Sequence, residues 1–236
     1  MTLEDIIYKR KSSRHFKDEQ LPEDTLKDIE DFISNIQSLI DIETKHKIVG
    51  RDEVKTVLRW SAPHYLAIFS KKSKNSYLNV GFIYQQVDLY LQSLGLGSCW
   101  IGLASYTGEK IEGYNFIIFI GFGKTENNNY REFNEFNRKN LEEISDKIDE
   151  KLKPAQYAPS AINAQPWYFK HNNDSIDVYC KKPNIIKKRF VSNLPYIDVG
   201  IALAHLYIAN KDKFEFFIKE NPIKINKHEY MGSIII

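Results

Sequence analysis

The chain has 236 residues, of which 42% are hydrophobic and 27% charged, and its formal net charge is +2. This composition is typical of a globular protein with a sizeable core, and it gives no reason to expect a nucleic acid or a membrane as a partner. Since there is no signal-peptide pattern, no run of about 18 apolar residues, and only two distant cysteines, Cys99 and Cys180, we expect a cytoplasmic protein without disulfides or a thiolate zinc site.

Hydrophobic periodicity predicts helices and strands along the first half of the chain. Thr2 suits a helix N-cap, Pro22 suits a first helical turn, and Gly95 or Gly97 would end a long apolar helix. The elements expected here are helices over 2–10, 21–40 and 76–95 and strands over 65–72 and 112–123.

The second half shows the same alternation of helices and strands. Two polar segments, 10–18 and 124–140, have loop character. The elements expected in the second half are helices over 141–153 and 196–210 and strands over 175–182 and 229–236.

The likeness between the halves indicates an internal duplication. The two most apolar helices share a Val-Gly pair, Val80-Gly81 in the first and Val199-Gly200 in the second. Two strands and another helix align in the same order at offsets of roughly 110 to 119 residues, which is consistent with a unit of about 115 residues used twice. Chance similarity between helices and strands is the alternative.

Three segments occur in one half only. RKSSRHF at 10–16 and LGLGSCWIG at 94–102 have no counterpart in the second half, and APSAINAQPW at 158–167 has none in the first. Each half has kept what the other lost, so two complementary half-sites would combine into one complete site. We therefore expect the halves, 1–130 and 131–236, to form one globular unit.

These segments resemble the motifs of the nitroreductase-fold flavoenzymes, in particular a subgroup with two protomer-like halves fused in one chain. Residues 10–14 resemble the pattern R-[RH]-S-x-R, and residues 158–169 resemble A-P-S-x-x-N-x-Q-P-W-x-F. Residues 94–102 resemble L-G-L-G-[ST]-C-W-I-G, and residues 138–143 resemble R-K-P-L-E-E. The resemblance covers most of the chain, and the second and third of these motifs are the specific ones.

The resemblance implies an α+β fold of two related halves, each with an antiparallel sheet and a long central helix, packed about a pseudo-two-fold axis. It implies FMN as cofactor, NADH or NADPH as hydride donor, and reduction of nitroaromatics, quinones or similar acceptors through flavin N5. In the homodimeric relatives each FMN lies between two subunits. Because this chain carries both half-sites, we expect a monomer.

The resemblance also implies a set of FMN-binding residues. Arg10 and Arg14 would project from one face if the first helix continued through them, where guanidinium groups suit a phosphate or the N1–C2 edge of reduced flavin. The backbone from Cys99 to Gly102 is expected near N5, and Gln165 and Trp167 are expected to brace their loop. The complete set is Arg10, Lys11, Ser12, Arg14, Cys99, Trp100, Ile101, Gly102, Arg138, Pro159, Ser160, Ala161, Asn163 and Gln165.

Each of these predictions has a simpler alternative. Residues 10–14 would otherwise be a solvated helix end, and 158–167 a capping or turn cluster. Arg138, together with Arg131, would otherwise belong to a solvated linker. His205 lies in an apolar helix and is expected to be a satisfied core histidine, and we place no metal site.

A second function class competes with the oxidoreductase. Lys11 and Asn140 depart from the family pattern, as they would in a flavin-binding protein without turnover, such as a sequestering or sensing module. In the oxidoreductase FMN, and no side chain acting as nucleophile or base, would carry the chemistry.

Overall fold

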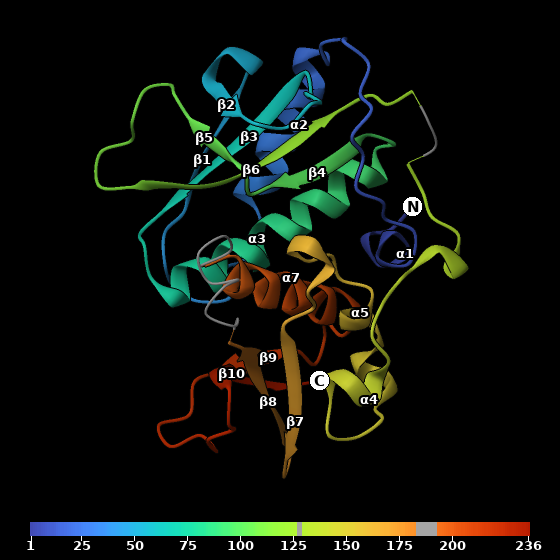
Figure 1. Cartoon of the computed structure of the whole chain (residues 1–236), viewed down its shortest axis with the longest axis vertical. Helices are drawn as coiled ribbons and strands as arrows, with labels where there is room; N and C mark the ends of the chain where they lie inside the picture. The colour runs from blue at the N-terminus through green and yellow to red at the C-terminus, as the bar shows by residue number, and fades with distance from the viewer. Residues whose placement is uncertain (127–128, 183–192) are drawn as a thin grey trace.

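Two long helices lie between two antiparallel sheets, which occupy opposite ends of the molecule (Figure 1). The computed structural model describes residues 1–126, 129–182 and 193–236. The central helices are α3 (Lys74–Ser93) and α7 (Leu194–Ala209), close to the ranges that the sequence predicts. The fold class is α+β, as expected.

The first sheet has the strand order β1-β3-β6-β4 and is antiparallel throughout. Every residue of β3 is buried, because alternate side chains point to opposite faces and both faces are covered. Leu66 and Ile68 pack with α3, whereas Tyr65 and Phe69 pack in a second apolar cluster on the other face. The strands are β1 (Lys45–Val49), β3 (His64–Ser70), β4 (Gly97–Ile101) and β6 (Asn115–Gly123), with a separate ribbon of β2 (Val54–Thr56) and β5 (Ala104–Tyr106).

The second sheet has the strand order β7-β8-β10-β9 and is also antiparallel. The sequence predicts β8 and β10 but neither β7 nor the short edge strand β9. The strands are β7 (Trp167–Asn172), β8 (Ser175–Lys181), β9 (Glu215–Phe217) and β10 (His228–Ile235). This sheet packs on α7, so each central helix has a sheet on its outer side (Figure 1).

The central helices cross at two glycines. A Cβ added to Gly81 of α3 would lie 2.0 Å from the carbonyl oxygen of Ile197, and one added to Gly200 of α7 would lie 2.0 Å from that of Leu78. The two backbones are therefore in direct contact, and no larger residue fits at either position. Most of the remaining surface of both helices is buried in one continuous apolar core. Within the described part of the chain, no helix combines the length and apolar character needed to cross a membrane.

Several short helices complete the fold. Thr2 is the N-cap of α1, as predicted, and its side chain forms a capping box with Asp5. The short elements are α1 (Leu3–Ile7), α2 (Glu23–Ser34), α4 (Leu141–Ile144), α5 (Lys153–Gln156) and the 3₁₀ turns η1 (Arg51–Glu53), η2 (Phe133–Glu135), η3 (Glu150–Leu152) and η4 (Ala161–Asn163).

Two predicted helices are too long. The first is predicted over 2–10, but α1 ends at Ile7, because the chain beyond it forms isolated bridges from Arg10 to Tyr130 and from Ser12 to Ser98. The second was expected to reach residue 40 but ends at Ser34. Backbone amides within both predicted ranges, or just beyond them, bond to distant residues instead of continuing a helix. After α1 these are the amides of Lys11 and Ser13, and after α2 the amides of Leu39 and Ile40.

The helix predicted over 141–153 is also wrong. It is divided into α4, η3 and α5, since Ser145 adopts extended backbone and forms a bridge with Phe169 of β7. The amide of Asp146 then donates to the carbonyl of Phe169 at 3.1 Å. Pairing with the second sheet has overridden a helical pattern at this point.

Replacing Gly81 by Ala tests the helix crossing. In an ordinary helix interior this change stabilises by roughly 1 kcal/mol. Here we expect a loss of about 3 kcal/mol in the free energy of unfolding, because the new methyl group meets backbone that must move. Urea denaturation measures the difference.

Gly102→Ala is the matched control. A Cβ there would first meet the flexible Leu194 side chain, at 3.1 Å, so the loss should be smaller. Equal stability of Gly81→Ala and the parent chain would contradict direct backbone contact between α3 and α7.

Candidate functional site

A cavity of about 510 Å³ lies where the two halves of the chain meet. Its wall combines the segment after α1, residues 58–60, β4 with the residues that follow it, the loop from Pro159 to Ile162, and one face of α7. This volume falls within the range of small-molecule sites, roughly 300–1,000 Å³, and the wall is mostly apolar with few polar groups, as in such sites.

Both predicted half-sites contribute to this one cavity. Ser12 and Arg14 line it from the first half, together with Cys99, Trp100, Ile101 and Gly102. The stretch Pro159–Ala161 lines it from the second half. More than 140 residues of sequence separate Arg14 from Pro159, so the sequence motifs identified residues that only the fold brings together. Arg10, Lys11, Arg138, Asn163 and Gln165 do not line the cavity.

Arg10 is buried behind the cavity wall. It is 1% exposed, and its Nε donates to Asp88 Oδ2 on α3 at 3.0 Å. Its Nη2 donates to Ser12 Oγ at 3.2 Å. Arg10 and Arg14 would share a helical face only if the first helix continued through them, and it ends at Ile7. Arg10 positions Ser12, and only Arg14 of the two arginines reaches the cavity.

The segment after α1 is fixed to α3 and β4 by a buried polar network. The amide of Lys11 donates to Gln92 Oε1 at 2.9 Å, and the amide of Ser13 donates to the carbonyl of Ser98 at 2.9 Å. Ser98 Oγ donates to Asp88 Oδ1 at 2.6 Å. Asp88 therefore accepts hydrogen bonds from Arg10 and Ser98 at once, which holds the backbone between Arg10 and Arg14 against β4.

A second branch of the network joins the two central helices. Gln85 of α3 accepts from the indole Nε1 of Trp100 at 3.0 Å, and its amide nitrogen lies 3.0 Å from Asp88 Oδ2 and 3.2 Å from His205 Nε2. His205 Nδ1 lies 3.0 Å from the Pro154 carbonyl. Burial lowers the pKa of His205 to about 3. The prediction of a satisfied core histidine is confirmed.

Cys99 is a buried side chain in β4, not an activated nucleophile. Burial raises the pKa of its thiol above the ordinary value, although the charges of Arg14 and Arg10 oppose the shift. A thiol held in the protonated form is a weak nucleophile. Cys99 therefore contributes shape to the cavity wall.

The loop after α5 has a strained backbone. Ile162 has φ 51° and ψ 24°, and Asn163 and Gln165 also have positive φ values, 56° and 46°. The left-handed region is unusual for a β-branched residue, and such strain persists only where surrounding contacts impose it. Ser160 Oγ accepts from the amide of Gln165 at 2.9 Å, which closes the loop on itself.

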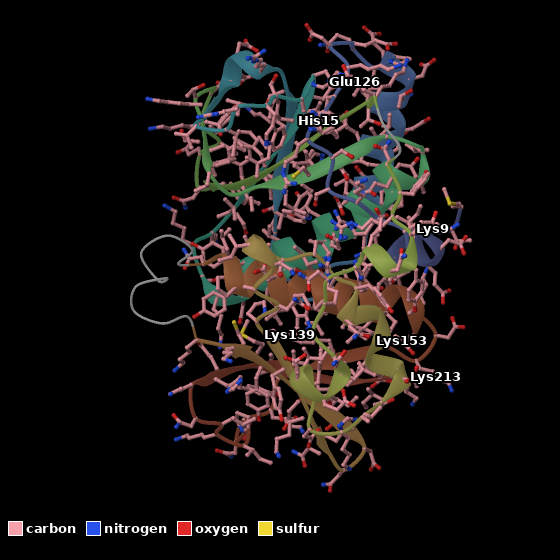
Figure 2. The ribbon with its side chains drawn as sticks, turned by 45° about the vertical axis from the view of Figure 1, so that its right-hand side comes forward. Lys9, His15, Glu126, Lys139, Lys153 and Lys213 are labelled. Atoms are coloured by element: carbon pink, nitrogen blue, oxygen red, sulfur yellow. The ribbon has the colours of Figure 1, made fainter. Side chains whose placement is uncertain are left out.

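Asn163 and Gln165 hold this loop to the segment 137–139. Gln165 Oε1 accepts from the amide of Lys139 at 2.8 Å, and Arg138 Nη1 donates to Asn163 Oδ1 at 2.8 Å. Lys139, labelled in Figure 2, donates through Nζ to the carbonyls of Ala164 and Gln165. The bracing role predicted for Gln165 is confirmed, whereas Asn163 is directed to Arg138 and not to the cavity.

Four arginines gather beside the site, with little negative charge among them. This arginine cluster consists of Arg10, Arg14, Arg131 and Arg138. Burial, together with the charges of Arg10 and Arg131, lowers the pKa of Arg138 to about 10. Burial also lowers the pKa of Arg131, helped by Arg10 and Arg14. Within the described residues, Arg10 is the one member in an ion pair, and Arg138 Nε is buried without a hydrogen-bond partner. The cluster has the charge and the free donors to bind an anion.

Sequence reasoning missed several site residues. Leu58, Trp60 and Leu103 line the cavity but belong to no motif. Asp88 and Asp198 were also missed, although each is an acid in the middle of an apolar helix, and that pattern is a usable signal for a buried functional group. Of the described residues, no group of three or more His, Cys, Asp or Glu side chains is arranged to hold a metal ion.

Comparison with protein families gives one match over nearly the whole chain. A family model described as "Putative TM nitroreductase" matches residues 2–232. No curated protein matches the chain.

One solved structure shows the same fold over the whole chain. A protein from Thermotoga maritima described as "a putative nitroreductase" is 20% identical, and the match covers 100% of this chain and 94% of that one with a TM-score of 0.69. An FMN-dependent nitroreductase from Clostridium difficile is 18% identical over 55% of this chain and 94% of that one, with a TM-score of 0.46. One from Mycobacterium smegmatis, solved with NADPH, is 13% identical over 52% of this chain and 88% of that one, with a TM-score of 0.42.

Replacing Asp88 by Asn tests the buried network. The guanidinium of Arg10 would remain buried without its anion, and breaking such a pair costs about 3–5 kcal/mol. We expect a loss of that size in the free energy of unfolding, measured by urea denaturation. Glu150→Gln, which breaks the exposed pair with Lys153, is the control and should leave stability unchanged. A small effect of Asp88→Asn would show that the network does not hold the segment.

Proposed function

The chain belongs to the putative TM nitroreductase family, and from that premise we propose that it binds FMN and uses NADH or NADPH to reduce nitroaromatics, quinones or similar acceptors. The observation that carries the proposal is the single cavity in which Ser12 and Arg14 meet Pro159, Ser160 and Ala161. Motifs that resemble two flavin half-sites contribute to one wall.

The cavity suits a planar, mostly apolar ring with polar edges. Trp100, Ile101 and Ile118 supply apolar surface, and Gly102 leaves room for close approach of the backbone. Ser160 provides a hydroxyl at the rim of the strained loop. A few polar groups on an apolar wall can orient a ring without filling the space that it needs.

The arginine cluster suits the phosphate. Among the described residues, Asp88 is the one carboxylate in an ion pair with the cluster, and it pairs with Arg10, so a further anion would be stabilised there. Arg138 has a buried Nε without a partner and is the strongest candidate for a direct contact. Arg131 is the second candidate. Arg10 acts indirectly, through its charge and through Ser12.

The protein residues bind and orient, and they do not react. FMN, when bound, would supply hydride transfer through its N5. Arg14 is the cation on the cavity wall, and its charge would favour an anionic form of the cofactor over a neutral one. Because the Cys99 thiol has a raised pKa, no nucleophile is assigned. FMN binding without turnover would favour a sequestering or sensing protein instead.

We also propose that the chain is an internal duplication with halves 1–130 and 131–236. Three observations support it. The two sheets have the same topology. If the four strands of each sheet are numbered in chain order, both sheets have the spatial order 1-2-4-3, which is β1-β3-β6-β4 in one and β7-β8-β10-β9 in the other. In each half the long helix follows the second strand. Gly81 lies against the carbonyl of Ile197, three residues before Gly200, and Gly200 lies against the carbonyl of Leu78, three residues before Gly81. This reciprocal spacing is the pattern that a two-fold axis between the helices produces.

A covalent pair of halves would complete the site within one chain. The linker keeps the halves at an effective concentration of order mM, so no second chain is needed. We therefore propose a monomer, with one site, because each motif is present once.

Flavin titration tests the function and its stoichiometry. The purified chain should bind one FMN per polypeptide, seen as a perturbed visible flavin spectrum, and should then oxidise NADH or NADPH when menadione is supplied as acceptor. Light scattering should give the mass of a monomer at micromolar concentration, with FMN retained on dilution.

The outcomes separate the parts of this proposal. A chain that binds no FMN would contradict the function altogether. Two FMN per chain would contradict the single composite site. An obligate dimer that loses FMN as it dissociates would show that the site forms between chains.

Arg138→Gln tests the phosphate assignment. A hydrogen bond to a charged group contributes about 1.5–3 kcal/mol, so FMN should bind at least tenfold more weakly. Riboflavin lacks the phosphate, and its affinity should not change. Lys27→Gln, on the exposed side of α2, is the control and should affect neither ligand. An equal loss for FMN and riboflavin would assign Arg138 to loop structure alone.

A further inference from the structure

Asp198 is a buried acid with one unpartnered oxygen in the cavity wall. It lies on α7, is 4% exposed, and lines the cavity. Its Oδ1 accepts a hydrogen bond from the amide of Ala161 at 3.0 Å. Its Oδ2 is buried and has no hydrogen-bond partner among the described residues. None of the roles assigned above uses this oxygen.

The surroundings of Asp198 disfavour the ionised form. The same face of α7 carries Leu194, Ile197 and Ile201, which also line the cavity. Burial raises the pKa of Asp198 to about 8, opposed only by the Ala161 amide, and no charged group among the described residues offsets the burial.

The ionisable groups around Asp198 come from three other elements. Arg14 and Cys99 line the same cavity from the segment after α1 and from β4. Cys180 of β8 lies close enough to Asp198 for the two groups to interact. Burial is the largest cause that raises the pKa of the Cys180 thiol, and the charge of Asp198 is the second. A buried thiol does not supply the positive charge that an aspartate would need, and Arg14 has no ion pair with it.

On α3, the other central helix, the position that corresponds to Asp198 carries an amide side chain, Asn79. Asn79 lies two residues before Gly81, as Asp198 lies two residues before Gly200. Asn79 Oδ1 accepts from the amides of Leu39 and Ile40, and its Nδ2 donates to the carbonyl of Ile42 at 2.8 Å. One end of the side chain accepts from a loop and the other end donates. Asp198, whose side chain lines the cavity, has the same accepting end, but its other end is buried without a partner among the described residues.

We propose that Asp198 is a neutral carboxylic acid whose Oδ2 hydroxyl donates a hydrogen bond to a carbonyl or nitro oxygen of the molecule in the cavity. The protonated state follows from the site itself, whereas the identity of the occupant rests on the function proposed above. A donor at this point selects for a ligand that places an oxygen acceptor there and against one that places a hydrogen-bond donor there. It also leaves no uncompensated charge on the apolar wall.

The protonation state is testable without any ligand. The unfolded chain loses the Asp198 proton near pH 4 and the folded chain retains it to about pH 8, so the folded state is disfavoured as pH rises between these values. The quantity to measure is the stability ratio, which is the equilibrium constant for unfolding of the parent chain divided by that of Asp198→Asn. This ratio should therefore rise about tenfold per pH unit between pH 5 and 7. Asp174→Asn, in an exposed turn, is the control and should give a constant ratio.

The hydrogen bond is testable by ligand binding at pH 6. Asp198→Asn keeps both an acceptor and a donor and should bind FMN within about threefold of the parent chain. Asp198→Leu has a similar volume but no donor and should lose about tenfold. If the bonded oxygen belongs to the acceptor substrate, Asp198→Leu should instead keep FMN affinity and raise the KM for menadione about tenfold.

Three results would overturn the inference. A stability ratio that does not change with pH would show that Asp198 is ionised in the folded chain. An Asn variant as weak as the Leu variant would show that the carboxylate itself is required. A Leu variant with unchanged FMN affinity and unchanged KM would show that Oδ2 contacts neither ligand. If the parent chain binds no FMN, the proposed function fails, while the stability ratio still decides the state of Asp198.

Discussion

The contact between α3 and α7 at Gly81 and Gly200 is the constraint on which the site depends. Two backbones in van der Waals contact have a separation that side-chain repacking cannot adjust. β4 packs on α3, and the loop with Ser160 is fixed to α7 through Asp198. The distance between these two cavity walls is therefore set by the helix crossing, although neither glycine lies in the cavity.

Polar groups in the core determine how the remaining wall is attached. Asp88 binds Arg10 and Ser98 together, and Gln85 links Trp100 with His205. An apolar core tolerates small shifts between its parts, whereas a buried network has low energy only when all its partners meet. The segment that carries Ser12 and Arg14 has no regular secondary structure, so this network replaces the rigidity that a helix or strand would give.

The sequence predicts the architecture well and the individual side-chain roles less well. Apolar periodicity located both central helices and four of the sheet strands, because burial on all sides leaves a strong signal. Local pattern could not distinguish Arg10 from Arg14, since the difference is made by Asp88, which lies 78 positions from Arg10. The helix predicted over 141–153 failed for a related reason. Its periodicity is helical, but Ser145 pairs with a strand that lies beyond it in the chain.

The two buried acids of the central helices give the site two electrostatically different ends. Asp88 is paired with Arg10, and the arginine cluster beside this pair retains an excess of positive charge. Asp198 lies on an apolar wall, where burial favours the neutral acid. A ligand with a phosphate at one end and a neutral ring with carbonyl oxygens at the other would complement both ends in one orientation only. FMN, the cofactor proposed above, has that polarity, so the same side-chain type, placed in two environments, would orient it as well as bind it.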